Sequence, residues 1–272
     1  MQKGFSTNTY LLGGGTLTKF KKVEFDEIKE YRNQYLDSIY ESQELYIEWI
    51  VLKSDYFIIE IEEPVGYFII SPENIMVEFY LTKSSIKYCE WIFKKVMEEF
   101  KVEKIYCKSF DSLLMKCCHK RSMSYEIIGT LFRDYIDTEM DDMSEYLIRK
   151  ATKDDIPCLL LQKDELYESE DELYLLVKNN NIYMYYFEGQ LVGCGFIIKV
   201  LEDRNYYDIG MWVKTEYRNR GIASRIISNL KGACIKNHMI PICGCAVDNI
   251  ASKKTLEKNG FHSKHDLIEY KV

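Results

Sequence analysis

The chain is poor in the two residues that most often break regular structure, since its 272 residues include only 4 prolines and 14 glycines. These low numbers exclude a collagen-like or low-complexity chain. No stretch approaches the ~18 consecutive apolar residues of a membrane-spanning helix. Residues 1–10 carry one charge and lack the apolar centre of a signal peptide, so no secretory segment is expected.

Metal-ligand patterns are also missing. The four histidines form no ligand spacing, and neither Cys243-x-Cys245 nor the vicinal Cys117-Cys118 has a second ligand pair at zinc spacing. We therefore expect no metal site. The nine cysteines are odd in number and lie in a long chain, which is typical of reduced thiols in the cytoplasm.

The composition that remains is that of a globular protein, with 47% hydrophobic and 29% charged residues. A chain of this length predicts two domains or one large one. Its 36 basic and 43 acidic residues give a net charge of −7. An acidic surface argues against nucleic acid and favours a small cationic ligand as the partner.

Hydrophobic spacing divides the first half into helices and strands. Residues 20–53 have helical spacing without proline or glycine, and two β-rich runs follow as a hairpin through Glu62-Glu63-Pro64. The remaining elements are expected at 75–81 (strand), 88–100 (helix), 104–108 (strand), 112–119 (helix) and 125–135 (strand).

An acidic segment separates this half from the next. Residues 134–145 contain six carboxylates, which we interpret as a connection between domains 1–142 and 143–272. A solvated loop within one domain is the alternative. The second half then repeats a similar order, with strands expected at 146–150, 182–187, 191–199, 206–213, 241–247 and 267–271 and helices at 221–236 and 251–259.

The two halves can be aligned as a divergent duplication. Val65-Gly66 matches Val192-Gly193 at an offset of 127, and Asp111-Ser112 matches Asp248-Asn249 at an offset of 137. We assign the difference to a loop, present only in the second half, between the third strand and the following helix. Chance similarity between two mixed α/β halves is the alternative.

That loop carries the clearest chemical signal. It reads Arg218-Asn-Arg-Gly221-Ile-Ala223 between a strand and an amphipathic helix. Glycine permits unusual backbone angles, alanine permits close approach, and free amides at a helix N-terminus attract a diphosphate. The alternative is a plain helix cap with a surface pair of arginines.

Three ordered motifs make the second half similar to the GNAT superfamily of N-acetyltransferases. Arg218-x-x-Gly221-x-Ala223 resembles the family's acyl-CoA diphosphate loop, and Asn249-x-x-Ser252 with the later Gly260-Phe261 resembles its second CoA segment. Residues 148–156 resemble its first strand and helix start. The resemblance covers residues 146–272 and implies an α/β fold of two tandem GNAT-like domains, each a mostly antiparallel mixed sheet flanked by helices, with the first copy degenerate.

The resemblance also implies the cofactor site, with acetyl-CoA as cosubstrate. Backbone groups of the strand end would pair with the pantetheine arm, and loop amides would hold the diphosphate. Ordinary alternatives are a core strand role for Val213 and a helix N-cap for Asn249. The cofactor-binding residues implied are Met211, Trp212, Val213, Arg218, Asn219, Arg220, Gly221, Ile222, Ala223, Ser224, Asn249 and Ser252.

Catalysis requires a base for the amine and a proton for the departing thiolate. Asp208 stands where relatives carry a glutamate, which makes it the candidate base; alternatively it only binds a cationic substrate. The usual tyrosine acid is replaced by Leu256. Cys245 flanks the expected thioester, and we interpret it as a small buried thiol rather than a nucleophile.

These observations together predict an acetyltransferase acting on a primary amine of a small cationic molecule by direct attack in a ternary complex. The alternatives are a protein amine acceptor, a non-catalytic acyl-CoA-binding regulatory module, or an unrelated α/β protein. Internal pairing of tandem halves favours a monomer over a homodimer.

Overall fold

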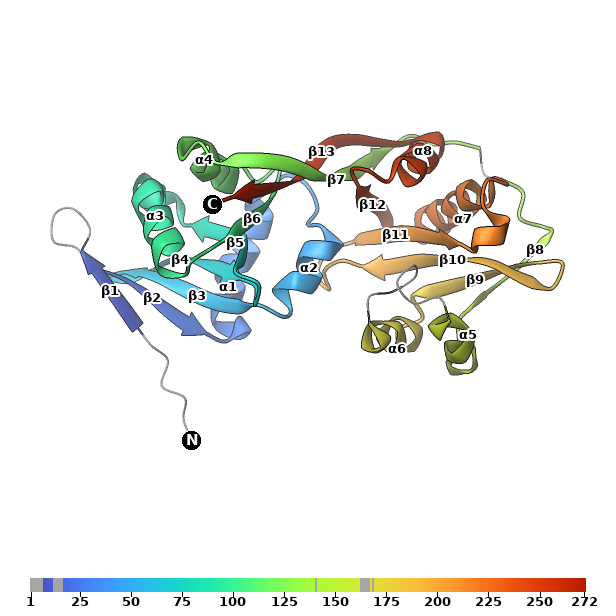
Figure 1. Ribbon diagram of the computed structural model, residues 1–272, viewed down its shortest axis with the longest axis horizontal. Coiled ribbons are helices and arrows are strands. Elements are labelled where there is room, and N and C mark those ends of the chain that lie inside the picture. Colours follow the sequence, from blue (N-terminus) through green and yellow to red (C-terminus); the bar gives the residue numbers. More distant parts are fainter. Residues whose placement is uncertain (1–6, 12–16, 140, 162–166, 168) are drawn as a thin grey trace. The chain divides into compact units, whose positions relative to one another are not determined.

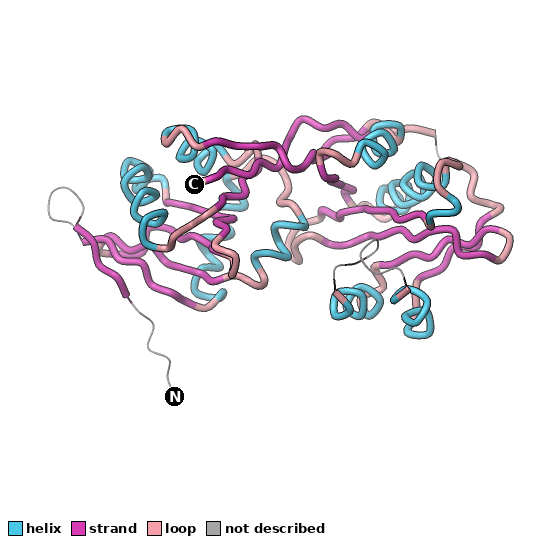
Figure 2. Tube along the Cα trace, viewed as in Figure 1, coloured by secondary structure: helices cyan, strands magenta, loops and turns pink. Residues whose placement is uncertain are grey.

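The chain forms two compact units. The computed structural model describes residues 7–11, 17–139, 141–161, 167 and 169–272, shown in Figures 1 and 2. Unit 1 comprises residues 1–130 and 265–272, and unit 2 comprises residues 131–264. Each unit is a mixed sheet with helices packed against both faces, which confirms the predicted fold class.

The sheet of unit 1 has the strand order β1-β2-β3-β4-β5-β6-β13. Its strands pair antiparallel, apart from β5 and β6, which are parallel. The predicted hairpin of residues 56–70 is present as β3 and β4. The strand bounds are β1 Thr7–Leu11, β2 Leu17–Val23, β3 Asp55–Ile61, β4 Glu63–Ile70, β5 Ile75–Leu81, β6 Lys104–Lys108 and β13 Phe261–Lys271.

The helices of unit 1 divide between the two faces of this sheet. On one face lie α1 (Phe25–Ser38) and α2 (Leu45–Val51), and on the other α3 (Cys89–Glu99) and α4 (Ser112–Lys120). The helix expected from residue 20 begins only at Phe25, because the preceding residues pair with β3 as strand β2. Helical spacing over so short a segment is overridden by the partner strand.

Unit 2 repeats the arrangement with the strand order β7-β12-β11-β10-β9-β8. Strands β8 to β11 pair antiparallel, whereas β11 and β12 are parallel. The second half restarts the order of the first, as the sequence predicts. The bounds are β7 Ser124–Tyr135, β8 Tyr146–Lys150, β9 Ile182–Phe187, β10 Gln190–Lys199, β11 Tyr206–Val213 and β12 Ile240–Ala246.

Two helix pairs cover the sheet of unit 2 (Figure 1). Helices α5 (Ile156–Leu160) and α6 (Glu170–Lys178) pack on one face, and α7 (Ile222–Lys236) and α8 (Ile250–Lys258) pack on the other. Gly195 on β10 allows α7 to approach closely, because a Cβ at this position would lie 2.9 Å from Leu230 Cδ1. The missing side chain therefore lets the body of α7 pack closely against the sheet.

The compact units divide the chain after Thr130 and after Lys264. The sequence places one division at residue 142, inside the acidic stretch. Strand β13 explains the return to unit 1, because its residues 267–271 pair antiparallel with β6. No local pattern encodes this long-range pairing.

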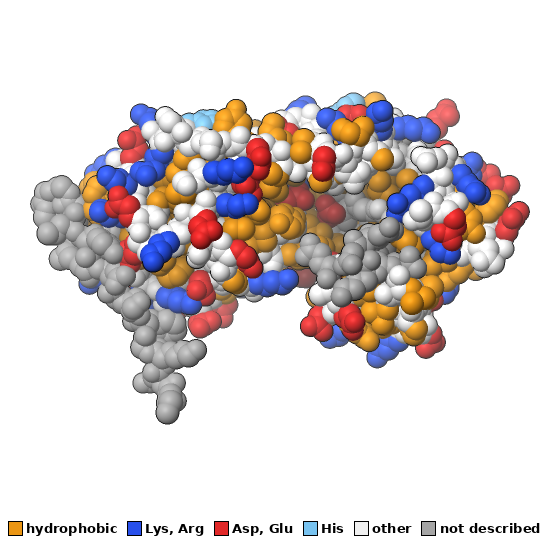
Figure 3. Space-filling view, in the orientation of Figure 1, with side chains coloured by type: hydrophobic (Ala, Val, Ile, Leu, Met, Phe, Trp, Pro, Cys, Tyr) orange, Lys and Arg blue, Asp and Glu red, His pale blue; other side chains and the backbone are white. Residues whose placement is uncertain are grey.

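Figure 3 shows basic and acidic side chains interspersed on the visible face of unit 1.

Among the described residues, no helix combines the length and apolar character needed to cross a membrane. The nine cysteines are all unbridged, and seven of them are buried. No group of three or more metal-ligating side chains occurs in the part of the chain that the structure describes.

Candidate functional site

Strands β11 and β12 separate to form a wedge in unit 2. Their parallel pairing covers only Tyr206 to Asp208, where Asp208 lies opposite Ile242. β11 continues from Asp208 to Val213, and β12 continues from Ile242 to Ala246. Among the described residues, no backbone pairing joins these two continuations. A strand edge without a partner strand exposes backbone donors and acceptors, so the wedge can bind a linear chain carrying amide groups.

The register shows which backbone groups face this wedge. The Lys214 amide donates to the Val192 carbonyl at 3.0 Å, and the β10–β11 ladder continues without a shift from Gly193↔Val213 to Lys199↔Tyr207. Antiparallel pairs alternate, so Trp212 and Asp208 direct their backbone groups to β10. Met211 and Val213 direct theirs to the wedge. Of the three predicted pantetheine-binding residues, these two have suitable backbone orientation.

Helix α7 begins at a cradle of backbone amides. The loop 214–221 leaves β11 through a 3₁₀ turn, η3 (Thr215–Tyr217), and turns with positive φ at Asn219 (62°) and Gly221 (78°). Among the described residues, no acceptor is found for the amides of 219–224. A Cβ built on Gly221 would meet nothing within 4 Å. Free amides, the positive end of a helix and open space together fit a diphosphate group.

The two arginines of the loop differ in what they contact. Arg218 donates from Nε to the Val213 carbonyl at 3.0 Å, which ties the loop to the end of β11. Arg220 lies with its guanidinium 5.5 Å from the centre of the Tyr217 ring. Both residues are exposed. Arg218 thus shapes the cradle, while Arg220 supplies positive charge beside it.

Ser224 contributes differently from its neighbours in the first turn of α7. Its side chain is buried, and its hydroxyl accepts a hydrogen bond of 3.0 Å from Asn259 Nδ2. Ile222 is also buried, whereas Ala223 is partly exposed. The side chains of Ile222 and Ser224 therefore anchor the helix, and only their amides face the cradle.

The second predicted segment forms the start of α8. Asn249 is its N-cap, with Oδ1 accepting from the Ser252 amide at 3.0 Å. The structure thus supports the ordinary role considered for Asn249, which is an exposed residue. Leu256 is only 2% exposed and packs in the core with Phe261, so it offers no proton donor.

Alternation along β11 places Asp208 on the face opposite α7. Ile209 and Val213 pack with α7, whereas Trp212 packs with the core of α5 and α6. Because side chains two apart share a face, Asp208 lies on the side of α5 and α6. Cys243 packs with α7, and Cys245 lies against that same core, on the other face from Asp208. Cys245 is partly exposed, so the expectation of a buried thiol is wrong.

Two buried polar residues that the sequence did not single out, Lys231 on α7 and Asn259 at the end of α8, hold these two helices together. Lys231 Nζ donates to the Asn259 carbonyl at 2.6 Å and to Thr138 Oγ1 at 2.8 Å. Burial lowers the pKa of Lys231, and the negative charge of Asp137 offsets part of this effect. A lysine on a helix has no local signal for such a role, since its acceptors come from residues far away in the chain.

A salt bridge orients the first strand of unit 2. Arg149 donates to both carboxylate oxygens of Asp155 at 2.7 Å and to Tyr186 Oη at 2.8 Å. The Arg149 hydrogen bond, assisted by the amide and hydroxyl of Thr152, lowers the pKa of Asp155 to about 2. Thr152 caps the turn that follows β8, in a capping box with Asp155, where residues 148–156 predict a helix start.

Unit 1 has an equivalent wedge without an equivalent cradle. Strands β5 and β6 pair only at Ile75↔Lys104 and Met76↔Ile105. The connection to α3 spans residues 82–88 and forms a 3₁₀ helix, η1 (Lys83–Tyr88), whereas its counterpart in unit 2 spans 214–221. The expectation of a loop missing from the first half is therefore wrong. The lengths are nearly equal, and the sequence offset arises in the preceding hairpin and in the longer α7.

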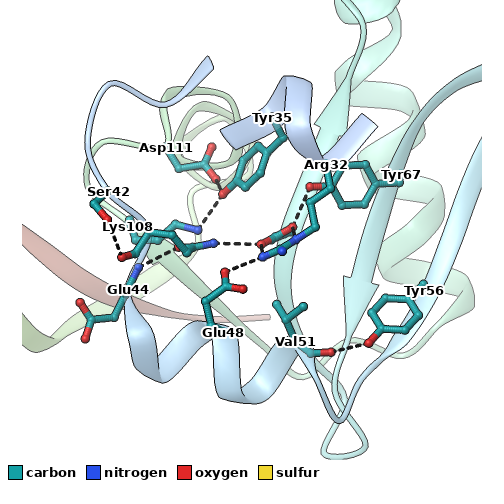
Figure 4. Close-up of polar contacts among 12 residues, drawn as sticks. Arg32, Tyr35, Ser42, Glu44, Glu48, Val51, Tyr56, Tyr67, Lys108 and Asp111 are labelled. Carbon is teal, nitrogen blue, oxygen red and sulfur yellow. Dashed lines mark hydrogen bonds and ion pairs between the residues drawn. The ribbon is translucent and has the colours of Figure 1, made fainter. Parts of the chain in front are cut away.

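A buried ion network fills one side of the wedge in unit 1 (Figure 4). Arg32 binds Glu78 through Nε at 3.1 Å and Nη2 at 2.8 Å, and it also pairs with Glu48. Burial alone would raise the pKa of Glu78, but Arg32 and Lys108 outweigh it, so the pKa is lowered. The pKa of Glu48 is raised by burial. This side of unit 1 is a packed core.

The paired wedge and cradle define an acyltransferase fold, and comparisons with known families agree. Residues 24–135 match the acetyltransferase (GNAT) domain and residues 141–261 match the acetyltransferase (GNAT) family. The chain therefore belongs to the GNAT acetyltransferases, with two GNAT domains in tandem. No match is found among curated proteins.

Solved structures share the tandem fold. A GNAT-family acetyltransferase from Colwellia psychrerythraea superimposes with a TM-score of 0.81 at 16% identity, covering 93% of this chain and 99% of that one. A tandem GNAT protein from the clavulanic acid biosynthesis pathway gives 0.62 at 10% identity, with 94% and 98% covered. Identities this low show the fold alone.

Proposed function

We propose that unit 2 transfers an acetyl group from acetyl-CoA to a primary amine of a small cationic molecule. The cradle of free amides at 219–224, beside the wedge, is the observation that carries this proposal. Bound acetyl-CoA supplies the acetyl group as an activated thioester. The Met211 and Val213 backbone groups bind the pantetheine arm, and the Met211 amide polarises the thioester carbonyl.

Asp208 is the proposed base. It lies at the apex of the wedge, on the face of α5 and α6, where an amine can approach without meeting α7. Its carboxylate accepts a proton from the ammonium group, directly or through water, so that the neutral amine can attack the carbonyl carbon. The C–N bond forms as the C–S bond breaks. Because Leu256 cannot donate, the departing sulfur takes its proton from water or from the outgoing ammonium.

The acidic net charge of −7 favours a cationic acceptor over an acidic one. Cysteines without disulfide bonds fit the reducing cytoplasm as the compartment, and the tandem halves fit a monomer better than a homodimer. Neither nucleic acid nor a membrane surface is an expected partner.

Titration calorimetry with acetyl-CoA tests the cofactor site. Gly221→Glu places a carboxylate in the cradle, so affinity should fall by at least about 100-fold, or about 2.7 kcal/mol. Gly189→Glu is the matched control, because Gly189 also has positive φ (76°) and open space around its Cβ. It should bind as the wild type does. No binding by the folded wild type, or equal loss in both variants, would overturn the proposal.

Thiol release with a panel of amines separates the enzyme from its alternatives. Release stimulated by small cationic amines supports the proposal. Stimulation only by peptides or folded proteins would make it a protein acetyltransferase, and tight binding of acetyl-CoA without release would make it a regulatory module.

A further inference from the structure

Unit 1 contains a cavity of about 480 Å³ at the open end of its wedge. Its walls come from the last turn of α1, the end of β5, η1 and the first turn of α4. This volume is typical of sites for small molecules. The cavity is lined by residues of unit 1 alone.

Negative electrostatic features dominate the polar lining. The residues that line the cavity include two acidic residues, Asp37 and Asp111, and one basic residue, Lys83. Helix α1 ends at the cavity and carries no basic residue in its last turn. The carbonyl end of a helix has partial negative charge and favours a cation.

Asp111 lines the cavity, and two hydrogen bonds hold its carboxylate in place. The residue is 2% exposed, its Oδ1 accepts from the Leu114 amide at 3.1 Å, and its Oδ2 accepts from Tyr35 Oη at 2.7 Å. Tyr35 Oη in turn accepts from Lys108 Nζ at 2.6 Å, so the Tyr35 hydroxyl lies between the two charges (Figure 4). Carboxylate oxygens can each accept a further hydrogen bond. As the N-cap of α4, Asp111 also offsets the attraction of that helix end for anions.

The rest of the lining suits the body of an organic ligand. Tyr35 and Tyr80 lie with their ring centres 6.2 Å apart, and Ile86 adds an exposed apolar side chain to the same lining. Aromatic rings stabilise an ammonium group beside them. Two carboxylates, a helix C-terminus and aromatic rings in one cavity therefore match an organic cation better than a neutral or anionic molecule.

We propose that this cavity is a binding site for a small organic amine in its ammonium form, with the charged nitrogen at Asp111 and the apolar body against Tyr80 and Ile86. The site belongs to unit 1 and does not depend on acetyl transfer by unit 2.

Three probes of one shape test the charge preference on the full chain. Titration calorimetry with benzylamine, benzyl alcohol and benzoate compares a cation, a neutral molecule and an anion. Benzylamine should bind at least about tenfold more tightly than benzyl alcohol, and benzoate should bind least. Equal affinity for all three, or preference for benzoate, would overturn the proposal, as would no binding of benzylamine at millimolar concentration.

Variants locate the site. Asp111→Asn keeps an acceptor for the Leu114 amide but removes the charge, so benzylamine affinity should fall about tenfold. Asp26→Asn, at the exposed opposite end of α1, is the control. If Asp111→Asn does not fold, Ile86→Trp fills the cavity from its partly exposed side and should abolish binding. Benzylamine binding should survive Gly221→Glu, which separates this site from the proposed cofactor site.

Discussion

Arg218 donates a hydrogen bond from its Nε to the carbonyl of Val213 at 3.0 Å, joining the cradle loop to the last residue of β11. The loop and the strand end are the two parts of the cofactor site that must keep a fixed separation. The arginine therefore positions the amides of 219–224 against the wedge, besides adding charge. This role differs from direct diphosphate binding, although both involve the same side chain.

Arg218→Met should raise the Kd for acetyl-CoA about tenfold, because the loop loses a charge-assisted hydrogen bond of about 1.4 kcal/mol. Titration calorimetry measures the change, with Arg121→Met in unit 1 as the control. Arg218→Lys should recover little, because lysine lacks the planar guanidinium that reaches the carbonyl. An unchanged Kd in Arg218→Met would show that the loop holds its shape without this contact.

Asp208→Asn should lower kcat by about 10²–10⁴-fold while leaving the Kd for acetyl-CoA unchanged, since the residue lies on the face opposite α7. The remaining activity should increase with pH, as more of the acceptor becomes neutral without help. Steady-state kinetics over a pH series measures both effects, and Asp208→Glu should restore part of kcat. A raised KM for the amine with unchanged kcat would instead assign the residue to substrate binding alone.

The second half was predicted well because its signals are local. The strand, the loop with Gly221 and the helix after it lie consecutively in the chain, so their order together with the other two motifs predicts a cradle at this loop. Asn249 and Thr152 cap helices where the sequence placed helix starts. Such features depend on neighbours a few residues away, which sequence patterns record.

Long-range contacts could not be predicted in the same way. Strand β13 returns to pair with β6, and Lys231 binds carbonyls of residues distant from α7. The ion network of Arg32 joins α1, α2 and β5, although each residue alone resembles a surface charge. The prediction that the second half has an extra loop was also wrong. An offset between two aligned sequences does not show which element is longer.

Asp155→Asn should cost about 1–2 kcal/mol at neutral pH, allowing for the partial exposure of Arg149. The Asp155 pKa is lowered to about 2 from 3.8, so the folded state favours the ionised form. This stabilisation is complete above about pH 4 and is lost as the pH falls toward 2. Urea unfolding across that range should show the wild type and the variant converging. A constant gap at all pH values would assign the effect to packing.

Arg32→Met should destabilise unit 1 by about 3–5 kcal/mol, because it leaves Glu48 and Glu78 buried without their partner. Adding Glu78→Gln should recover part of the loss. Urea unfolding is followed by tryptophan fluorescence in a Trp212→Phe background. The signal then comes from Trp49 and Trp91, both in unit 1. The exposed pair of Lys22 and Asp55 provides the control, since Lys22→Met should cost less than about 1 kcal/mol.

Leu256→Tyr restores the residue type that relatives use as acid, yet it should not increase kcat. Leu256 is 2% exposed and packs with Phe261 and Ile222, so a tyrosine there overfills the core and buries a hydroxyl. We expect a loss of about 1–3 kcal/mol by urea unfolding, against less than about 1.5 kcal/mol for Leu256→Met. A kcat at least about tenfold higher would show that position 256 reaches the departing sulfur. An unchanged or lower kcat supports the proposal that the thiolate takes its proton from water or from the outgoing ammonium, and not from a side chain on α8.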